Sequence, residues 1–201
     1  MQASINAGVD VERLEGPMRT CFQHGTQNML DHGKAVQNAF LGLLGCLTGD
    51  GKALAGCRLP EWLQEPSIQA EILGRLMHPA ILARYHLYHD CGKPFCREVD
   101  ENGRQHFPGH AAKSAETWRA VGGDEATGRL IAMDMDIHTI SAEGMEEFAN
   151  RSEAASLYLT GLAEIHANAT MFGGIESTGF KSKFKHLDRR GRALIRAWNF
   201  T

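Results

Sequence analysis

Apolar residues at helical spacing are the feature that most constrains this chain. Between Leu30 and Leu47 they recur every three or four positions, and Gly49 and Gly51 follow at the end. This spacing predicts an amphipathic helix, because residues three and four positions apart share one helix face. The same pattern predicts, after a loop over 48–60, further helices near 68–77, 80–90, 109–121, 124–138, 152–170 and 187–198. The sequence therefore predicts an all-α fold.

One stretch breaks the helical pattern. Residues 91–108 hold glycines, prolines and the pair Asn102-Gly103, which lies between two short polar and apolar runs. Because Asn-Gly is a strong signal for a two-residue turn, we expect a loop or a small β-hairpin inserted here. We find no internal repeat, low-complexity tract or linker, so we expect a single domain over residues 1–201.

Composition excludes several classes of protein. With 43% hydrophobic residues and a net charge of −3, the chain is neither disordered nor collagen-like. Five cysteines without a Cys-x-x-Cys pair argue against a disulfide framework and a thiolate zinc finger. The longest apolar run, Ala39 to Leu47, is far shorter than the roughly 20 residues that span a bilayer. The first residues lack the features of a secretory signal, so we expect a cytoplasmic protein without membrane contact.

Histidine is the residue type that points to chemistry. Ten histidines are present, and five of them lie near both helix signals and acidic residues: His32, His89, His110, His138 and His166. Their long separations fit one ligand per helix, which is how a helical bundle builds a metal site. Imidazole and carboxylate without thiolate favour a divalent metal, one or two ions of Mn, Fe, Co, Ni, Zn or Mg.

The adjacent pair His89-Asp90 is a special case. Neighbouring residues on a regular helix point about 100° apart and seldom share a ligand. They do so at a helix end, where the backbone turns, and the Gly92 and Pro94 that follow predict such an end.

Three segments resemble a known family. The runs LDHGKAV (30–36), YHLYHDCGKPF (85–95) and HFPGHAAKSA (106–115) resemble the HD superfamily of metal-dependent phosphohydrolases. The HDCGKP and FPGH portions are similar to the HD modules of RNA end-processing enzymes and of CCA-adding tRNA nucleotidyltransferases. The resemblance covers about residues 28–170 and implies an HD-type helical bundle with a divalent metal.

The resemblance also implies site residues, position by position. Those that match metal ligands of the family are His32, His89, Asp90, His110 and His138. The family closes its site with an aspartate on a late helix, but the comparable stretch here, LAEIHANA (162–169), has His166 at that place. Either His166 or a carboxylate from Asp134 or Asp136 would then complete the site.

The implied chemistry is hydrolysis at phosphorus. A divalent ion lowers the pKa of bound water toward about 7, which supplies hydroxide, and it polarises a phosphoryl oxygen. Lys93 is placed to neutralise a phosphate as a point charge. His110 and Asp136 are candidates to protonate the leaving oxygen.

Charge is distributed unevenly along the chain. Residues 176–201 hold seven Lys or Arg against two acidic residues, a local +5, whereas the other 175 residues sum to −8. This basic C-terminal segment predicts contact with a polyanionic substrate, with Lys181, Lys183 and Lys185 as the phosphate-binding candidates. The alternative is a solvated helix face.

The sequence thus predicts a phosphohydrolase that cleaves a phosphoester of a nucleotide or an RNA end, whether a phosphodiester, a cyclic phosphate or a phosphomonoester. One alternative is a dNTP triphosphohydrolase or nucleotide-pool pyrophosphohydrolase. Another is a catalytically weak HD fold that binds nucleotide or RNA. Many members of the family assemble, so a homo-oligomer is compatible with the resemblance.

Overall fold

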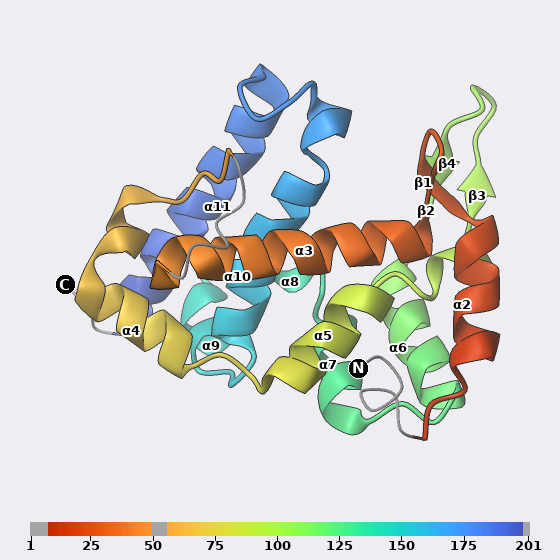
Figure 1. The fold of residues 1–201 in the computed structure, drawn as a ribbon, viewed down its shortest axis with the longest axis horizontal. Coiled ribbons are helices and arrows are strands. Elements are labelled where there is room, and N and C mark those ends of the chain that lie inside the picture. The colour runs from red at the N-terminus through yellow and green to blue at the C-terminus, as the bar shows by residue number, and fades with distance from the viewer. Residues whose placement is uncertain (1–7, 50–55, 199–201) are drawn as a thin grey trace. The chain divides into compact units, whose positions relative to one another are not determined.

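Helices dominate the computed structural model, which describes residues 8–49 and 56–198 (Figure 1). The predicted all-α class is confirmed, with two short two-stranded hairpins among the described residues. Residues 50–55 of the predicted loop lie outside the described part. None of the helices described is both long enough and apolar enough to cross a bilayer.

The chain divides into two compact units. Unit 1 comprises residues 1–35 and 78–135, and unit 2 comprises residues 36–77 and 136–201. The division falls within one long helix, α3, and between Met135 and Asp136. The single domain expected over the whole chain stays a prediction.

Unit 1 carries both hairpins. Its elements are α2 (Val11–Thr20), β1 (Phe22–His24), β2 (Gln27–Asn28), the start of α3 (Met29–Thr48), α5 (Pro79–Tyr88), the 3₁₀ turn η2 (Lys93–Phe95), β3 (Glu98–Val99), β4 (Gln105–His106), α6 (His110–Ala120) and α7 (Glu125–Ala132). The hairpin predicted near 91–108 is present, with Glu98 opposite His106 and Val99 opposite Gln105. Asp100 fixes its turn by accepting hydrogen bonds from the backbone N–H groups of Asn102 and Arg104.

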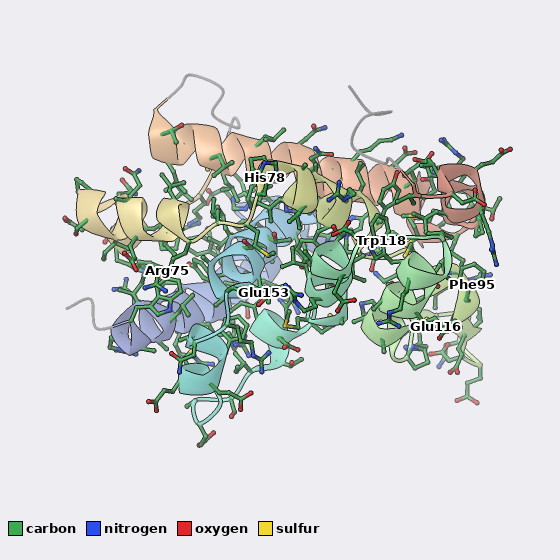
Figure 2. The ribbon with its side chains drawn as sticks, turned by 90° about the horizontal axis from the view of Figure 1, so that it is seen from below. Arg75, His78, Phe95, Glu116, Trp118 and Glu153 are labelled. Atoms are coloured by element: carbon green, nitrogen blue, oxygen red, sulfur yellow. The ribbon has the colours of Figure 1, made fainter. Side chains whose placement is uncertain are left out.

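An aromatic pair anchors the core of unit 1. Trp118 of α6, labelled in Figure 2, is fully buried and stacks on Tyr88 of α5 with ring centroids 5.6 Å apart. Its indole N–H donates to the carbonyl of Asp124, and the Tyr88 hydroxyl donates to Glu15 of α2. Both polar tips are therefore satisfied, as buried aromatic residues require.

Unit 2 is built on two long helices that pack side by side, α10 and α11 (Figure 1). Its elements are the remainder of α3, η1 (Glu61–Gln64), α4 (Pro66–Gly74), α8 (Asp136–Thr139), α9 (Met145–Ala149), α10 (Ala154–Ala167), η3 (Ala169–Phe172) and α11 (Thr178–Ala197). Most of α10 is buried, and the indole N–H of Trp62 donates to Asp188 of α11 at 2.7 Å. At the surface, the guanidinium of Arg75 (Figure 2) lies over the ring of Trp198.

Several helices differ from the predicted ones. The helix expected over 124–138 ends at Ala132, and α8 starts only at Asp136. The helix expected over 187–198 begins at Thr178, because the Ser177 hydroxyl caps it by accepting from the N–H of Phe180. Helix α2, which holds an internal proline, was not predicted.

Candidate metal centre

His32 lies in the first turn of α3. The turn is fixed locally, because the backbone N–H of Asp31 donates to the side-chain oxygen of Asn28 and the Asn28 amide donates back to the Asp31 carboxylate. This side-chain cap satisfies donors that a helix start leaves open. It sets the angle at which α3, and with it His32, enters the unit.

The His89-Asp90 doublet lies where α5 ends. The last helical hydrogen bond runs from the N–H of His89 to the carbonyl of Tyr85, and the chain then turns tightly into η2, with the N–H of Lys93 donating to the carbonyl of Asp90. At this turn both side chains point to one place, with His89 Nε2 3.3 Å from Asp90 Oδ2. The helix end predicted from the sequence is therefore present.

Two glycines let three backbone segments approach closely around the doublet. A Cβ at Gly33 would collide with the carbonyl oxygens of Leu87 and His86 in α5, and a Cβ at Gly92 would collide with the backbone of α6 at Ser114. Only glycine permits such contacts. The side chains of α3, α5 and α6 can consequently meet at one point.

That point is the Asp90 carboxylate, which three imidazoles surround. His32 Nε2 lies 3.7 Å from Asp90 Oδ2, and His110 Nε2 lies 3.9 Å from Oδ1. Asp90, His32 and His89 are each about 2% exposed. Ligands held about 2.0–2.2 Å from one ion lie roughly 3.0–3.6 Å apart, so the His89 distance falls in this range and the His32 and His110 distances exceed it slightly.

The rings are oriented by hydrogen bonds at their other nitrogens. His89 Nδ1 lies 3.0 Å from the carbonyl oxygen of His86, and His110 Nδ1 lies 3.1 Å from that of Phe107. A carbonyl only accepts, so Nδ1 must donate in both rings, and the neutral ring then turns the lone pair of Nε2 toward Asp90. Metal-binding histidines are fixed in this way by a bond from the second ring nitrogen.

The electrostatics of the cluster favour an ionised Asp90 carboxylate and a neutral His110 ring. Burial raises the pKa of the Asp90 carboxyl, but His89, Lys93 and His32 outweigh it and hold the pKa well below its usual range. Burial lowers the pKa of the His110 imidazole, against the opposing pull of Asp90. Asp90 Oδ1 is buried and has no hydrogen-bond partner among the described residues, which is consistent with a ligand atom.

Lys93 supplies a cation next to the cluster. Its ammonium donates to Asp90 Oδ2 at 2.7 Å and to the side-chain oxygen of Gln23 at 3.0 Å. Its exposed fraction is 8%, and its ammonium lies 5.4 Å from the ring centroid of Phe107. Lys93 therefore faces the same carboxylate as the three imidazoles.

Asp134 extends the cluster. It lies in the turn after α7, is buried, and accepts a 2.7 Å hydrogen bond from the hydroxyl of Tyr85. Two groups of three residues each bring their ligand atoms within 4.8 Å of one another. One group is Asp90, His110 and Asp134, and the other is His32, His89 and Asp90. Asp90 thus belongs to two groups that could each hold an ion, and these groups lie entirely within unit 1.

The thiol nearest the doublet is not a metal ligand in this arrangement. Cys91 donates from Sγ to the carbonyl of Ser114, and burial raises the pKa of its thiol far above the ordinary value. A protonated, hydrogen-bonded thiol binds metal poorly. The donor set of the cluster therefore consists of nitrogen and oxygen, as the sequence predicts.

Three other predicted site residues lie in unit 2 and have local partners there. His138 Nε2 is 2.7 Å from the Glu164 carboxylate, and the Asp136 carboxylate accepts from Arg151 at 2.6 Å. His166 uses both ring nitrogens: Nδ1 donates to the carbonyl of Leu162, and Nε2 accepts from the backbone N–H of Arg58. A metal role for His166, which stays a prediction, would require the bond from Arg58 to be given up.

The predicted phosphate-binding lysines lie on the first half of α11. Lys181 forms an ion pair with Glu176 at 2.9 Å, while Lys183 and Lys185 are exposed. Their side chains project from a continuous helix that begins upstream of the predicted one.

Sequence reasoning missed the residues that support the cluster. The hydroxyl of Tyr85 donates to Asp134, and the side-chain oxygen of Gln23 accepts from the ammonium of Lys93. The hydroxyl of Ser114 accepts from the backbone N–H of Gly92. No local pattern marks these three residues, because each acts on a partner more than 20 positions away. Glu164 was also missed. It lies on an apolar helix, one turn before Asn168, and a carboxylate at such a place needs a partner.

Comparison with known proteins gives no match: no protein-family model matches the chain, and neither does a curated protein or a solved structure.

Proposed function

We propose that the protein is a metal-dependent phosphohydrolase that cleaves a phosphoester of a nucleotide or an RNA end. The observation that carries the proposal is the convergence of three imidazole Nε2 atoms on the buried Asp90 carboxylate. The resemblance of the same residues to the HD superfamily supports it and supplies the reaction class.

The residues present fit a divalent metal. His32, His89 and Asp90 would hold one ion, and Asp90, His110 and Asp134 would hold a second, with Asp90 shared between them. Neutral imidazole and carboxylate suit Mn, Fe, Co, Ni, Zn or Mg. A bound divalent ion would activate water and polarise a phosphoryl oxygen.

The chain's own groups would do the rest. Lys93 carries a buried positive charge beside the cluster, where it would neutralise a substrate phosphate oxygen. Gln23 holds its ammonium in place at 3.0 Å. With only the first ion bound, Nε2 of His110 would be left to accept a proton, and burial lowers the pKa of its ring.

A hydrolysis assay with matched variants tests the proposal. The purified protein is given Mn²⁺ and bis-p-nitrophenyl phosphate, a 2′,3′-cyclic nucleotide or a dNTP, each in turn. We expect His89→Ala and Asp90→Asn to lower turnover by more than about 100-fold, since even the loss of an outer-shell partner costs 10- to 100-fold. The control is His106→Ala, because His106 lies on the exposed hairpin and bonds only to Asp100 among the described residues.

The substrates separate the alternatives. Turnover of dNTPs alone would replace the phosphoester proposal with a triphosphohydrolase. Unchanged turnover in His89→Ala, with normal folding by circular dichroism, would overturn the proposed site. Absence of turnover on every substrate, with Mn²⁺ bound, would favour the catalytically weak binding fold.

A further inference from the structure

A second cluster of basic side chains lines a cavity within unit 2. The cavity has a volume of about 260 Å³ and lies among α8, α10 and α11. Its lining residues are His138, Ile165, Lys183, His186, Leu187 and Arg190. They come from helices that pack on one another within the unit, so the cavity belongs to the fold rather than to a loop.

The lining carries positive charge over an apolar floor. Lys183 and Arg190 are basic, and no acidic side chain is among the lining residues. Ile165 and Leu187 are only 4% and 2% exposed and form the buried floor. Cations above an apolar floor favour an anion, because the low local polarity strengthens a charged contact.

The polar groups of the cavity are oriented by neighbours outside it. The Glu164 carboxylate holds His138 by a 2.7 Å bond, and the carbonyl of Ile140 accepts from Nε of Arg190. The second bond uses Nε, so the guanidinium presents its Nη groups for a two-point contact with an oxyanion. His186 Nδ1 accepts from Arg189 at 3.5 Å, which makes Nε2 the donor of that ring.

The basic side chains of the cavity lie in a setting that disfavours their positive charge. Burial and the neighbouring Arg189 lower the pKa of the Arg190 guanidinium, which shows that its charge is disfavoured where it lies. Like charges that line one cavity repel one another, and a bound anion would reduce that repulsion. The arrangement is therefore more typical of a binding site than of a solvated helix face.

Size limits what the cavity can hold. Pockets that enclose a drug-sized ligand are about 300–1,000 Å³, which is larger than this one. A tetrahedral phosphate fits with room to spare, whereas a whole nucleotide would extend outside.

We propose that this cavity, lined by Lys183, His186 and Arg190, binds the phosphate group of a small phosphorylated ligand. The group is either free inorganic phosphate or the terminal phosphate of a nucleoside monophosphate, whose base and sugar remain outside. The proposal goes beyond hydrolysis at Asp90, and its test needs no turnover.

Calorimetric titration of the full chain tests the proposal. Inorganic phosphate and AMP are titrated separately in the presence of EDTA, which removes metal from the Asp90 cluster. We expect Lys183→Gln and Arg190→Gln to weaken binding by about tenfold or more, because each removes a charge-assisted hydrogen bond. Arg104→Gln is the matched control: it makes the same substitution as Arg190→Gln at an exposed residue in the turn between β3 and β4, which does not line this cavity.

The outcomes are distinct. Binding of AMP that is tighter than that of phosphate identifies a nucleotide as the source, and equal binding identifies phosphate itself. A lack of heat and of chemical-shift change with both probes at millimolar concentration would overturn the proposal. Equal weakening by Arg104→Gln and Arg190→Gln would also overturn it, since that reports diffuse surface charge. His89→Ala should bind both probes like the wild type, which separates this site from the proposed catalytic one.

Discussion

The histidines of the two units have opposite environments. In unit 1, His89 and His110 each use Nδ1 on a backbone carbonyl and direct Nε2 at one buried carboxylate. In unit 2, His166 uses Nδ1 in the same way, but its Nε2 accepts a backbone N–H from Arg58. His138 bonds directly to Glu164.

This difference shows what decides the role of a histidine. All four rings lie on or beside helices and near acidic residues in the sequence, so spacing alone ranks them alike. The second nitrogen separates them: where it faces a carboxylate surrounded by further imidazoles, a cation is favoured. Where it already accepts a backbone N–H, a metal would have to displace that bond.

The largest predicted effect on Mn²⁺ affinity and turnover is that of replacing Lys93, beside the histidines of unit 1, by methionine. Lys93→Met keeps the aliphatic stem but removes the ammonium 2.7 Å from Asp90 Oδ2. We expect Mn²⁺ to bind more tightly, because a like charge beside the metal has gone. We expect turnover to fall by about 100-fold, because a donor preorganised toward the substrate phosphate is lost. Calorimetry and the hydrolysis assay measure the two changes.

Lys113→Met is the control, because Lys113 is exposed on α6 and pairs only with Glu116 among the described residues. Weaker Mn²⁺ binding in Lys93→Met would contradict the prediction. It would mean that Lys93 orients Asp90 and does not compete with the metal.

The close contact between α3 and α5 gives the next prediction. A methyl group at Gly33 has no room against the carbonyls of Leu87 and His86, so Gly33→Ala must push the helices apart. We expect the free energy of unfolding to fall by about 1–3 kcal/mol, as for other overpacked sites. His32 lies on α3 and His89 at the end of α5, so the two rings move apart with their helices. Mn²⁺ binding should therefore weaken as well. Urea unfolding and calorimetry are the measurements.

Gly16→Ala is the matched control in the same unit. Gly16 lies inside α2, and an added Cβ there meets no atom within 4 Å among the described residues outside the helix's own backbone. It should stabilise the protein by about 0.5–1 kcal/mol, as alanine does in place of glycine in a helix. If Gly33→Ala leaves both stability and Mn²⁺ affinity unchanged, the α3–α5 contact does not shape the cluster.

The sequence predicts the fold class and the local turn of the doublet because both depend on neighbouring residues. The spacing from Leu30 to Leu47 yields α3, and Asn102-Gly103 yields the hairpin of β3 and β4. The convergence of His89 and Asp90 follows from the helix end before Gly92.

What the sequence leaves undetermined depends on distant partners. Asp134 and Asp136 are equivalent in the sequence, but one accepts from Tyr85 and the other pairs with Arg151. His166 meets the N–H of Arg58, which is 108 positions away. Helix α11 extends upstream to Thr178 because Phe180 is buried and Ser177 caps it, against the low helix propensity of the glycines and serines around it.

The smallest predicted effect concerns the pH dependence of unit 2. Burial lowers the pKa of the His166 imidazole, and the hydrogen bond to Leu162 opposes this only in part. The folded state therefore binds a proton less readily than the unfolded chain, whose histidine pKa is about 6.5. The stability that depends on the neutral ring is present above about pH 6.5 and is lost as the pH falls through the folded-state pKa.

His166→Gln isolates this contribution, because a glutamine can donate to the carbonyl of Leu162 and accept from the N–H of Arg58 without titrating. Urea unfolding at about pH 7.5 and about pH 5 should show a larger loss of stability in the wild type, by at most about 1.4 kcal/mol per pH unit. The histidines of unit 1 are present in both proteins, so their titration cancels in the difference when EDTA is added. Equal losses would mean that the ring is protonated in the folded state without cost. Nε2 would then not be held by Arg58, and the contrast between the two histidine environments would disappear.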